Sequence, residues 1–417
     1  MNKKKSLLYL RTDIMSEPLV AGGSVAHTLG VVQGFIKKGY MVACASSVML
    51  DMLHECNLAQ LKELQNPRWL SFLRWKLNCF LSTFIFTWQA WRMFKDRKYD
   101  VLYQRYSVLN ATGVLLSRLK KIPLILEYNG SEVWIEKFWS RKATLQLLWL
   151  IRWIEQINLA QAQSIIVVSQ VLKDELCERG VDPHKICVVP NGVDYEEFDS
   201  GKLTEQRACI RSTLNLTDKF VFGFIGTFSQ WHGIELLADM IPRVVEKNPQ
   251  TFFLLIGDGP LHPFLKTSLQ KLGITNANVA FVGLVPQNSA KNYLAACDAF
   301  LSPTQPNADG SRFFGSPTKL FAYMSMSKPV LVSDLEQLKE IVSPALTIDK
   351  LNAINDKVVG IRIAPDSVEG FATAALWLAE HADSSVPHMG LHARARIEAH
   401  YGWNTHVSTI ESFISKG

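Results

Sequence analysis

The sequence predicts an α/β protein with two parallel-sheet domains, and three observations support this class. Apolar runs of strand length alternate with stretches of helical character along the whole chain, including "SLLYL", "IPLIL", "SIIVV", "FVFGF", "TFFLLI" and "PVLVS". Glycine-containing loops follow several of these runs, as they do in nucleotide-binding βαβ units. With 417 residues, the chain is also too long for a single ordinary core.

The composition indicates a folded, water-soluble protein. Hydrophobic residues make up 48% of the chain, charged residues make up 20%, and the net charge is +6. The seven cysteines show no metal-ligand spacing, which predicts reduced thiols and a cytoplasmic location. The apolar run after Lys3, Lys4 and Lys5 is too short for a signal peptide, so we expect a first β-strand there.

The first predicted βαβ unit contains a glycine pair. The strand "SLLYLRTD" is followed by Gly22 and Gly23, then by a helix and the strand "MVACAS". A bare glycine pair is a weak signal, because loops contain glycine anyway. His27 lies one turn into the helix, where a structural, a solvent-facing and a ligand-facing role all remain open.

Residues 67–98 combine bulky aromatic side chains with seven basic residues and one acid. This window holds Trp69, Trp75, Trp88 and Trp91, and a second cluster follows at Trp134, Trp139, Trp149 and Trp153. One interpretation is an amphipathic helix that covers the sheet, with its cations solvated. The other, which we favour, is an interfacial helix that associates peripherally with an anionic membrane surface. The uncharged stretch 77–91 is too short to span a bilayer.

Polar residues follow the apolar strand "PLIL" in the first half. Glu127, Tyr128, Asn129 and Glu132 stand at the end of this strand, where open α/β sheets place their ligands. The sequence therefore predicts a ligand-facing group at this strand end.

The alternation of strands and helices restarts at Phe220, after the turn "VVPNGVD". The strand "FVFGFI" ends at Gly226, and the next helix begins near Gly233, so the N–H groups of its first turn can face a diphosphate. "TFFLLIGDGP" and "NVAFVGLVP" supply two further strands with glycine turns.

The segment 309–334 predicts a phosphate seat. A glycine-containing loop leads to Ser316 as the N-cap and Pro317 as the first helical residue. The first turn carries Thr318 and Lys319, whose free N–H groups lie at the positive end of the helix dipole. The strand "PVLVSD" follows this helix.

These segments, in this order, resemble the retaining GT-B glycosyltransferases of family 4. The resemblance rests on residues 22–23, 190–194, 257–260, 315–324 and 328–334. It implies two Rossmann-like domains that face a cleft, and a C-terminal helix that crosses back onto the first domain. The implied boundaries are residues 1–192 for an acceptor domain, 193–395 for a nucleotide-sugar donor domain and 396–417 for the crossover helix.

The resemblance also implies roles for individual residues. His232 takes the place of a lysine that holds phosphate in the family, which suggests a weaker or pH-sensitive contact. Lys319 remains the principal cation. The residues implied for donor binding are Gly22, Gly23, Gly226, His232, Gly257, Asp258, Gly259, Val282, Gly283, Leu284, Phe314, Gly315, Ser316, Pro317, Thr318 and Lys319. The candidate catalytic residues are His27, Asn129, Lys319 and Ala322.

This chain departs from the resembled family at two points. The two positions of the family's Glu-x7-Glu signature fall on Phe314 and Ala322, and in the family the second glutamate is expected to hold the donor ribose. Either the departure at Ala322 is natural, or a Glu→Ala substitution was introduced to impair the protein. At the strand end, Asn129-Gly130 replaces the His-Asp pair of many members, so a role for Asn129 in holding the sugar or the acceptor is a hypothesis.

The implied function is retaining transfer of a sugar from a nucleotide-sugar donor to a lipid-linked glycan acceptor in surface polysaccharide biosynthesis. No D-x-D triplet occurs, so we expect no metal and no other cofactor, and leaving-group charge would be met by helix N-termini and Lys319. A nucleic-acid partner is not expected. One alternative is a catalytically weakened relative that acts as a binding or scaffold subunit, and another is a nucleotide-sugar epimerase on the same fold.

Overall fold

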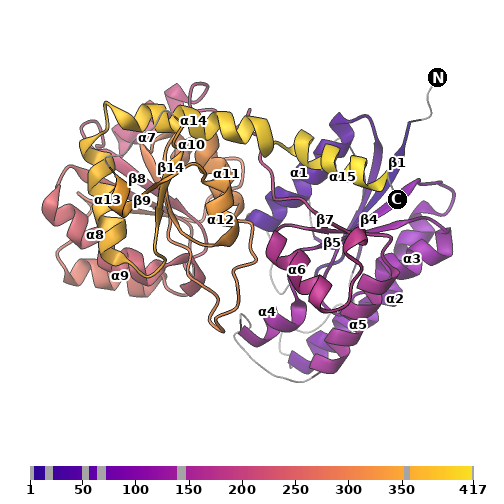
Figure 1. The fold of residues 1–417 in the computed structure, drawn as a ribbon. Coiled ribbons are helices and arrows are strands. Elements are labelled where there is room, and N and C mark those ends of the chain that lie inside the picture. The colour runs from indigo at the N-terminus through magenta and orange to yellow at the C-terminus, as the bar shows by residue number, and fades with distance from the viewer. Residues whose placement is uncertain are drawn as a thin grey trace. The chain divides into compact units, whose positions relative to one another are not determined.

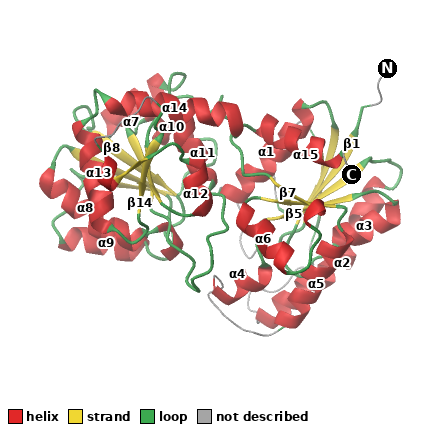
Figure 2. Cartoon of the chain, in the orientation of Figure 1, coloured by secondary structure: helices red, strands yellow, loops and turns green. Residues whose placement is uncertain are grey.

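The computed structural model describes residues 4–14, 22–48, 56–62, 72–138, 147–351 and 357–415. The chain divides into two compact units. Unit 1 comprises Met1–Leu19, His27–Pro190 and Trp403–Gly417, and unit 2 comprises Val20–Ala26 and Asn191–Gly402. In each unit a sheet of parallel strands is flanked by helices (Figure 2), which confirms the predicted α/β class.

Unit 1 contains a seven-stranded parallel sheet within the described residues, in the order β3-β2-β1-β4-β5-β6-β7. Its strands are β1 (Ser6–Arg11), β2 (Met41–Ser46), β3 (Asn57–Gln60), β4 (Val101–Arg105), β5 (Leu124–Tyr128), β6 (Ser164–Val167) and β7 (Ile186–Val188). The strand order reverses between β1 and β4, so the switch point of this doubly wound sheet lies there.

The helices of unit 1 cover both faces of its sheet (Figure 1). They are α1 (Gly23–Lys37), α2 (Phe72–Phe94), α3 (Thr112–Lys120), α4 (Glu132–Phe138), α5 (Leu148–Gln161), α6 (Gln170–Glu178), η1 (Pro183–Lys185) and α15 (Trp403–Ile414). On one side α3 packs against both α2 and α5. On the other side α1 lies so close to α15 that a Cβ atom at Gly30 would be 1.9 Å from the Trp403 ring.

The tryptophan-rich window forms one helix, α2, in the described residues. Trp75, Trp88 and Trp91 lie on α2, whereas Trp69 and Trp139 fall outside the described residues.

Unit 2 contains a second seven-stranded parallel sheet within the described residues, in the order β10-β9-β8-β11-β12-β14-β13. Its strands are β8 (Phe220–Ile225), β9 (Thr251–Ile256), β10 (Val279–Gly283), β11 (Ala299–Ser302), β12 (Val330–Ser333), β13 (Leu346–Thr347) and β14 (Gly360–Ile363). Its helices are α7 (Thr204–Thr213), η2 (Gln230–His232), α8 (Ile234–Lys247), α9 (His262–Lys271), α10 (Ala290–Ala295), α11 (Thr318–Ser325), α12 (Glu336–Ile341), η3 (Ile348–Lys350), α13 (Val368–Glu380) and α14 (Ser385–His400).

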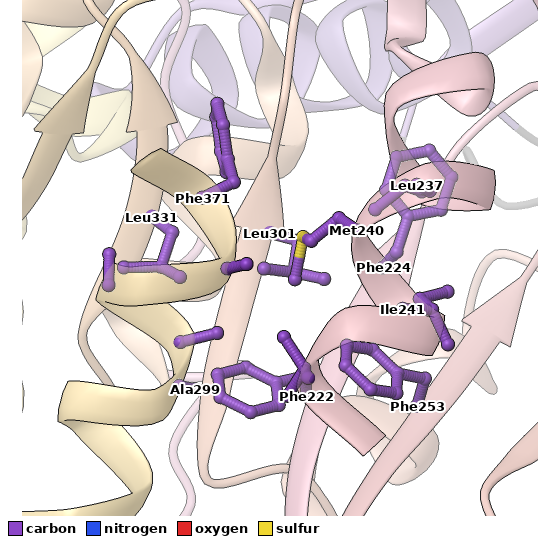
Figure 3. Packing of buried hydrophobic residues seen from close by; sticks show 14 of the residues in the cluster. Phe222, Phe224, Leu237, Met240, Ile241, Phe253, Ala299, Leu301, Leu331 and Phe371 are labelled. Carbon is purple, nitrogen blue, oxygen red and sulfur yellow. The ribbon is translucent and has the colours of Figure 1, made fainter. Parts of the chain in front are cut away.

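One apolar layer of unit 2 joins its sheet to α8 and α13 (Figure 3). Phe222 of β8 stacks on Phe253 of β9 with ring centroids 5.4 Å apart. Met240 and Ile241 of α8 are fully buried against these strands. Because both faces of a parallel sheet are covered by helices, its strands are apolar throughout, and this holds the loops at their carboxyl ends in place.

The C-terminal region differs from the single final helix that the sequence predicts. α14 ends at His400 and α15 begins at Trp403. Between them the Val193 N–H donates to the Tyr401 carbonyl (3.0 Å), and Val193 forms an isolated parallel bridge with Gly402. This backbone pairing interrupts the helix. The chain returns to unit 1 after Gly402, whereas the predicted boundary is residue 395. The long stretch of unit 1 ends at Pro190, close to the predicted boundary at residue 192, and residues 20–26 group with unit 2.

Candidate functional site

Glycines draw together the carboxyl ends of three neighbouring strands in unit 2. Gly226 follows β8 and Gly257 follows β9, and a Cβ atom at Gly257 would lie 2.0 Å from the Gly226 carbonyl oxygen. The Gly257 N–H donates to the Gly283 carbonyl at the end of β10 (2.8 Å). Only glycine allows the backbones to approach this closely, so the turns present main-chain groups instead of side chains.

Asp258 fixes the turn after β9. Its carboxylate accepts hydrogen bonds from the Gly259 N–H (2.7 Å) and from His262 Nδ1 (2.8 Å), and these two contacts lower the pKa of Asp258. The Phe228 N–H donates to the Asp258 carbonyl (2.9 Å). Gly259 sits so close to Phe228 that a Cβ atom would be 2.6 Å from the Phe228 carbonyl oxygen. Asp258 and Gly259 thus tie the loops after β8 and β9 to each other.

His232 lies at the end of η2, in the loop after β8. Its Nδ1 is 2.6 Å from the Thr227 carbonyl oxygen. Burial and the nearby Lys319 cation lower the pKa of His232 to about 3, against the opposing effect of the Thr227 carbonyl. The imidazole is therefore neutral at physiological pH in this structure. The weaker or pH-sensitive contact of His232 with a donor phosphate remains a prediction.

The helix that follows the predicted phosphate loop starts one residue later than the sequence predicts. α11 begins at Thr318, and Pro317 occupies the N-cap position without a capping side chain. Ser316 is not the cap, because its hydroxyl accepts from the Asn191 N–H (3.1 Å) and its carbonyl accepts from Asn191 Nδ2 (2.5 Å). The N–H groups of the first turn of α11 consequently receive no side-chain oxygen from Ser316.

Lys319 projects from the first turn of α11 into an apolar setting. Its Nζ is buried, lies 4.5 Å from the centroid of the Phe224 ring and has no hydrogen-bond acceptor in the part of the chain that the structure describes. Burial lowers the pKa of the ammonium to about 7. A buried cation without a counter-charge is unfavourable by itself, and a bound anion would relieve this.

A separate polar network lies at the strand ends of unit 1, centred on Glu127. This fully buried carboxylate accepts from the Tyr103 hydroxyl (3.0 Å), from Arg105 (2.6 Å) and from Asn129 Nδ2 (2.6 Å), and His27 Nε2 is 2.8 Å from it. Burial alone would raise the pKa of Glu127, but His27 and Arg105 outweigh it and hold this pKa well below its usual range.

In this structure, His27 and Asn129 therefore both contact the buried Glu127 carboxylate. The His27 ring is 2% exposed, and it packs edge-on against Trp403 and His406 of α15. The structure does not show His27 facing a ligand. The catalytic roles of His27 and Asn129 remain predictions. The sequence analysis missed Tyr103 and Arg105. Arg105 could have been found from strand register, because it stands directly opposite Glu127 at the ends of β4 and β5.

Comparisons with known proteins identify the family. A family model described as Glycosyltransferase Family 4 matches residues 21–197, and one described as Glycosyl transferases group 1 matches residues 219–381. The chain belongs to the GT-B glycosyltransferases of family 4.

Two curated relatives make glycans. A UDP-Gal:alpha-D-GlcNAc-diphosphoundecaprenol alpha-1,3-galactosyltransferase of Escherichia coli is 25% identical over 59% of this chain and 60% of its own length. The amylovoran biosynthesis glycosyltransferase AmsK of Erwinia amylovora is 26% identical over 60% of this chain and 54% of its own length. The matched part of the chain thus spans less than two thirds of either relative.

Among solved structures, HepE of Anabaena in complex with UDP superposes with a TM-score of 0.70 at 17% identity. The match covers 99% of this chain and all of that chain. This likeness shows a shared GT-B fold along the whole length of the described protein.

The two positions of the family's glutamate signature are both buried in this glycosyltransferase. Ala322 lies on α11, is 8% exposed and packs within the core of unit 2, and Phe314 in the preceding loop is 6% exposed. Gly315 is held against the Phe313 ring, which a Cβ atom would meet at 2.7 Å. A glutamate at position 322 would thus be a nearly buried acid one helical turn from Lys319.

At the end of β10, where a nucleotide base is predicted to bind, the Leu284 side chain is exposed and the Gly283 carbonyl is already hydrogen-bonded. Leu284 is 77% exposed, and Val282 is partly buried. One lone pair of the Gly283 carbonyl already accepts from the Gly257 N–H. The predicted main-chain contacts to a base remain possible through the other lone pair and the neighbouring N–H groups.

Gly22 and Gly23 stand where the first helix begins. The Val25 and Ala26 N–H groups both donate to the Gly22 carbonyl (3.1 Å each), and Gly23 is the first residue of α1. Neither glycine carries a side chain that could block an approaching ligand. Their predicted contact with donor phosphates remains a prediction.

Within the described residues, no helix is long and apolar enough to cross a membrane. In the same ranges, no group of three or more histidine, cysteine, aspartate or glutamate side chains is arranged to hold a metal ion.

Proposed function

We propose that this protein transfers a sugar from a nucleotide-sugar donor to a glycan acceptor, with retention of the anomeric configuration. The observation that supports the donor most directly is the Lys319 ammonium, which is buried at the N-terminal turn of α11 without an acceptor among the described residues. A diphosphate would supply the missing negative charge, and the free N–H groups of the same turn would bind its oxygens.

The proposed chemistry consists of positioning and electrostatic stabilisation. As the bond between sugar and diphosphate breaks, negative charge develops on the leaving oxygen, and a lysine in a water-poor site stabilises it strongly. Because Nδ1 of the neutral His232 donates to the Thr227 carbonyl, its Nε2 is an acceptor, and it can receive a hydrogen bond from a sugar hydroxyl without adding charge. We propose that the reaction needs no metal, because the sequence has no D-x-D triplet, and turnover should then persist in EDTA.

The proposed acceptor is a lipid-linked glycan in surface polysaccharide biosynthesis. The Escherichia coli relative is named for a diphosphoundecaprenol-linked acceptor, and the Erwinia amylovora relative for the synthesis of a polysaccharide. Such an acceptor lies at a membrane surface, so the enzyme would work on its cytoplasmic face.

An exposed apolar stripe on α2 supports membrane contact. Its members recur at alternating spacings of four and three residues, and they are Leu77, Leu81, Phe84, Trp88 and Trp91. Trp88 is 56% exposed, and the Arg92 guanidinium lies over its ring at 5.4 Å. Trp149 and Trp153 on α5 are 69% and 55% exposed. Exposed tryptophans beside cations are typical of helices that lie in the interface of anionic bilayers.

The donor proposal is tested by calorimetric titration with a panel of UDP, GDP, ADP and dTDP sugars. We expect saturable binding of one nucleotide class by the wild-type chain and sugar transfer to a lipid-linked acceptor extract. Absence of binding by every member of the panel would refute the donor proposal and favour the binding-subunit alternative.

The membrane proposal is tested by co-sedimentation with vesicles that contain phosphatidylglycerol. Replacement of Arg92, Lys95, Arg97 and Lys98 by glutamate should release the protein, since each basic residue near an anionic surface contributes about 1 kcal/mol. Undiminished co-sedimentation of the variant would rule out this surface as the docking site.

A further inference from the structure

The carboxyl ends of β1, β4 and β5 in unit 1 hold polar side chains that the proposed donor chemistry does not use. These strands are neighbours in the sheet, and β1 and β4 flank its switch point. In open α/β sheets, ligands bind in the crevice outside the strand ends at this point. Gln104 Nε2 on β4 is one buried atom here without a partner in the described structure. Two further side chains, Tyr106 just after β4 and Glu132 after β5, also have polar groups without partners there.

Tyr106 directly follows β4 and is 6% exposed. Its N–H donates to the Glu127 carbonyl (2.9 Å), and its ring stacks on that of Tyr128 with centroids 5.9 Å apart. The ring is thus fixed from two sides. Its hydroxyl, however, is buried and makes no hydrogen bond to any described residue. Buried hydroxyls without partners are rare, and each one calls for an explanation.

Glu132 is the first residue of α4, four residues after β5, and it is only partly buried. Its carboxyl forms no hydrogen bond or ion pair within the described ranges, whereas its N–H donates to Glu155 (3.0 Å). Burial and the carboxylates of Glu155, Asp13 and Glu136 raise the pKa of Glu132 to about 8, against the opposing effect of Arg105. Near neutral pH the carboxyl therefore holds a proton, and it can both donate and accept a hydrogen bond.

A chain of contacts links Tyr106 to Glu132. Tyr106 stacks on Tyr128, whose hydroxyl accepts from Arg179 (3.0 Å). Arg179 also donates to Glu155, which accepts from the Glu132 N–H. After burial, Glu155 and Glu132 raise the pKa of the Tyr106 hydroxyl, which agrees with this proximity. Glu155 itself is satisfied, because Arg179 donates to it at 2.6 Å. Glu127, on the next strand end, has a full set of donors as described above. Glu127 and Glu155 therefore have their partners, whereas the Tyr106 hydroxyl and the Glu132 carboxyl have none among the described residues.

We propose that Tyr106 and Glu132 form a binding site for the hydroxyl groups of an uncharged sugar residue, the acceptor of the proposed transfer. This inference rests on the proposed function, because it assigns the acceptor's chemical class. A phenol and a protonated carboxyl each donate and accept, which matches a sugar hydroxyl. A phosphate is disfavoured, because the basic side chains nearby already pair with carboxylates, as Arg105 does with Glu127 and Arg179 with Glu155. The stacked face of Tyr106 and Tyr128 adds an apolar wall of the kind found in ligand sites.

The test uses the whole chain without any donor. Saturation-transfer NMR is recorded with the methyl α-glycosides of glucose, galactose and N-acetylglucosamine as probes. We expect at least one glycoside to bind, and Tyr106→Phe and Glu132→Leu to weaken its binding by about five-fold or more, since each substitution removes one hydrogen-bonding group. Glu178→Leu is the matched control, because it makes the same change at an exposed carboxylate of the same unit.

A second readout does not depend on variants. In the wild-type chain labelled with ¹³C at the tyrosine ζ carbon, the glycoside should shift the Tyr106 resonance, which is assigned by its loss in Tyr106→Phe. Binding should also fall above about pH 8, where Glu132 loses its proton. Wild-type glycoside affinity in both variants, an unshifted Tyr106 resonance, or no binding of any glycoside would each overturn the proposal.

The donor titration of the previous section separates this inference from the proposed function. The Lys319 seat belongs to unit 2, whereas Tyr106 and Glu132 belong to unit 1. If nucleotide sugars bind and the glycosides do not, the acceptor assignment fails and the donor proposal stands. If the glycosides bind through Tyr106 and Glu132 and no nucleotide sugar binds, the site is real but the transferase proposal fails.

Discussion

Replacing Lys319 with methionine should stabilise unit 2 and weaken donor binding at the same time. Burial lowers the pKa of the Lys319 ammonium from 10.5 to about 7. One pKa unit corresponds to about 1.4 kcal/mol, so at pH 7 the buried ammonium opposes folding by on the order of 4 kcal/mol. Local relaxation reduces such penalties, and we expect Lys319→Met to raise the free energy of unfolding by about 1–3 kcal/mol.

The pH dependence of this gain has a definite sign. Between about 7 and 10.5 the unfolded chain binds more protons at Lys319 than the folded chain does, so wild-type stability rises with pH in this window. The methionine variant lacks this titration. The stability difference between the two proteins should therefore be largest at pH 7 and below, and it should fade towards pH 10.5.

Donor affinity should change in the opposite direction. A hydrogen bond from a charged group contributes about 1.5–3 kcal/mol, so the dissociation constant for the bound nucleotide should rise about 10- to 100-fold. Urea unfolding at pH 7 and 9 measures the stability, and calorimetry measures the binding. Lys339→Met, at an exposed lysine of α12, is the control. A destabilised variant, or an unchanged dissociation constant, would refute the reasoning.

Three further predictions concern Glu127, Gly259 and Ala322. Glu127→Gln should lower the free energy of unfolding of unit 1 by about 3–5 kcal/mol at neutral pH, because it leaves Arg105 buried without its counter-charge. Since the folded-state pKa of Glu127 is lowered from 4.5, the deficit should shrink only in urea melts below that pH. Gly259→Ala should impair nucleotide binding in the same calorimetric assay, because the added methyl group collides with the Phe228 carbonyl oxygen and displaces the turn; wild-type affinity would contradict this account. Ala322→Glu should raise nucleotide affinity by about ten-fold if the donor ribose lies beside α11, and equal affinity would place the ribose elsewhere.

Much of the fold was readable from local patterns. Parallel strands covered on both sides must be apolar along their length, so runs such as "TFFLLI" identify β9 without tertiary information. The glycine turns at Gly226 and Gly257 were equally visible, since only glycine permits the close backbone approach that they make. Lys319 could be placed near a helix N-terminus from the sequence alone, because Pro317 and the loop before it mark where a helix can start.

The partners of the polar groups were decided by tertiary structure. Ser316 has the chemistry of an N-cap, but Asn191, which is distant in the sequence, occupies its oxygens. The pairing of Arg105 with Glu127 depends on the register of β4 against β5. The burial of His27 depends on α15, which returns to unit 1 from the far end of the chain.

The sequence by itself therefore determined the fold class, the glycine turns and the position of Lys319, because each follows from short-range covalent and steric rules. Only the tertiary structure decided which polar groups are satisfied and which are left for a ligand. Hydrogen-bond satisfaction and desolvation depend on every neighbour of an atom, however far apart those neighbours lie in the chain. Tyr106 became a candidate only when its neighbours were known, and only the structure showed that Glu132, among the polar residues predicted at its strand end, has a carboxyl without a partner in the described residues.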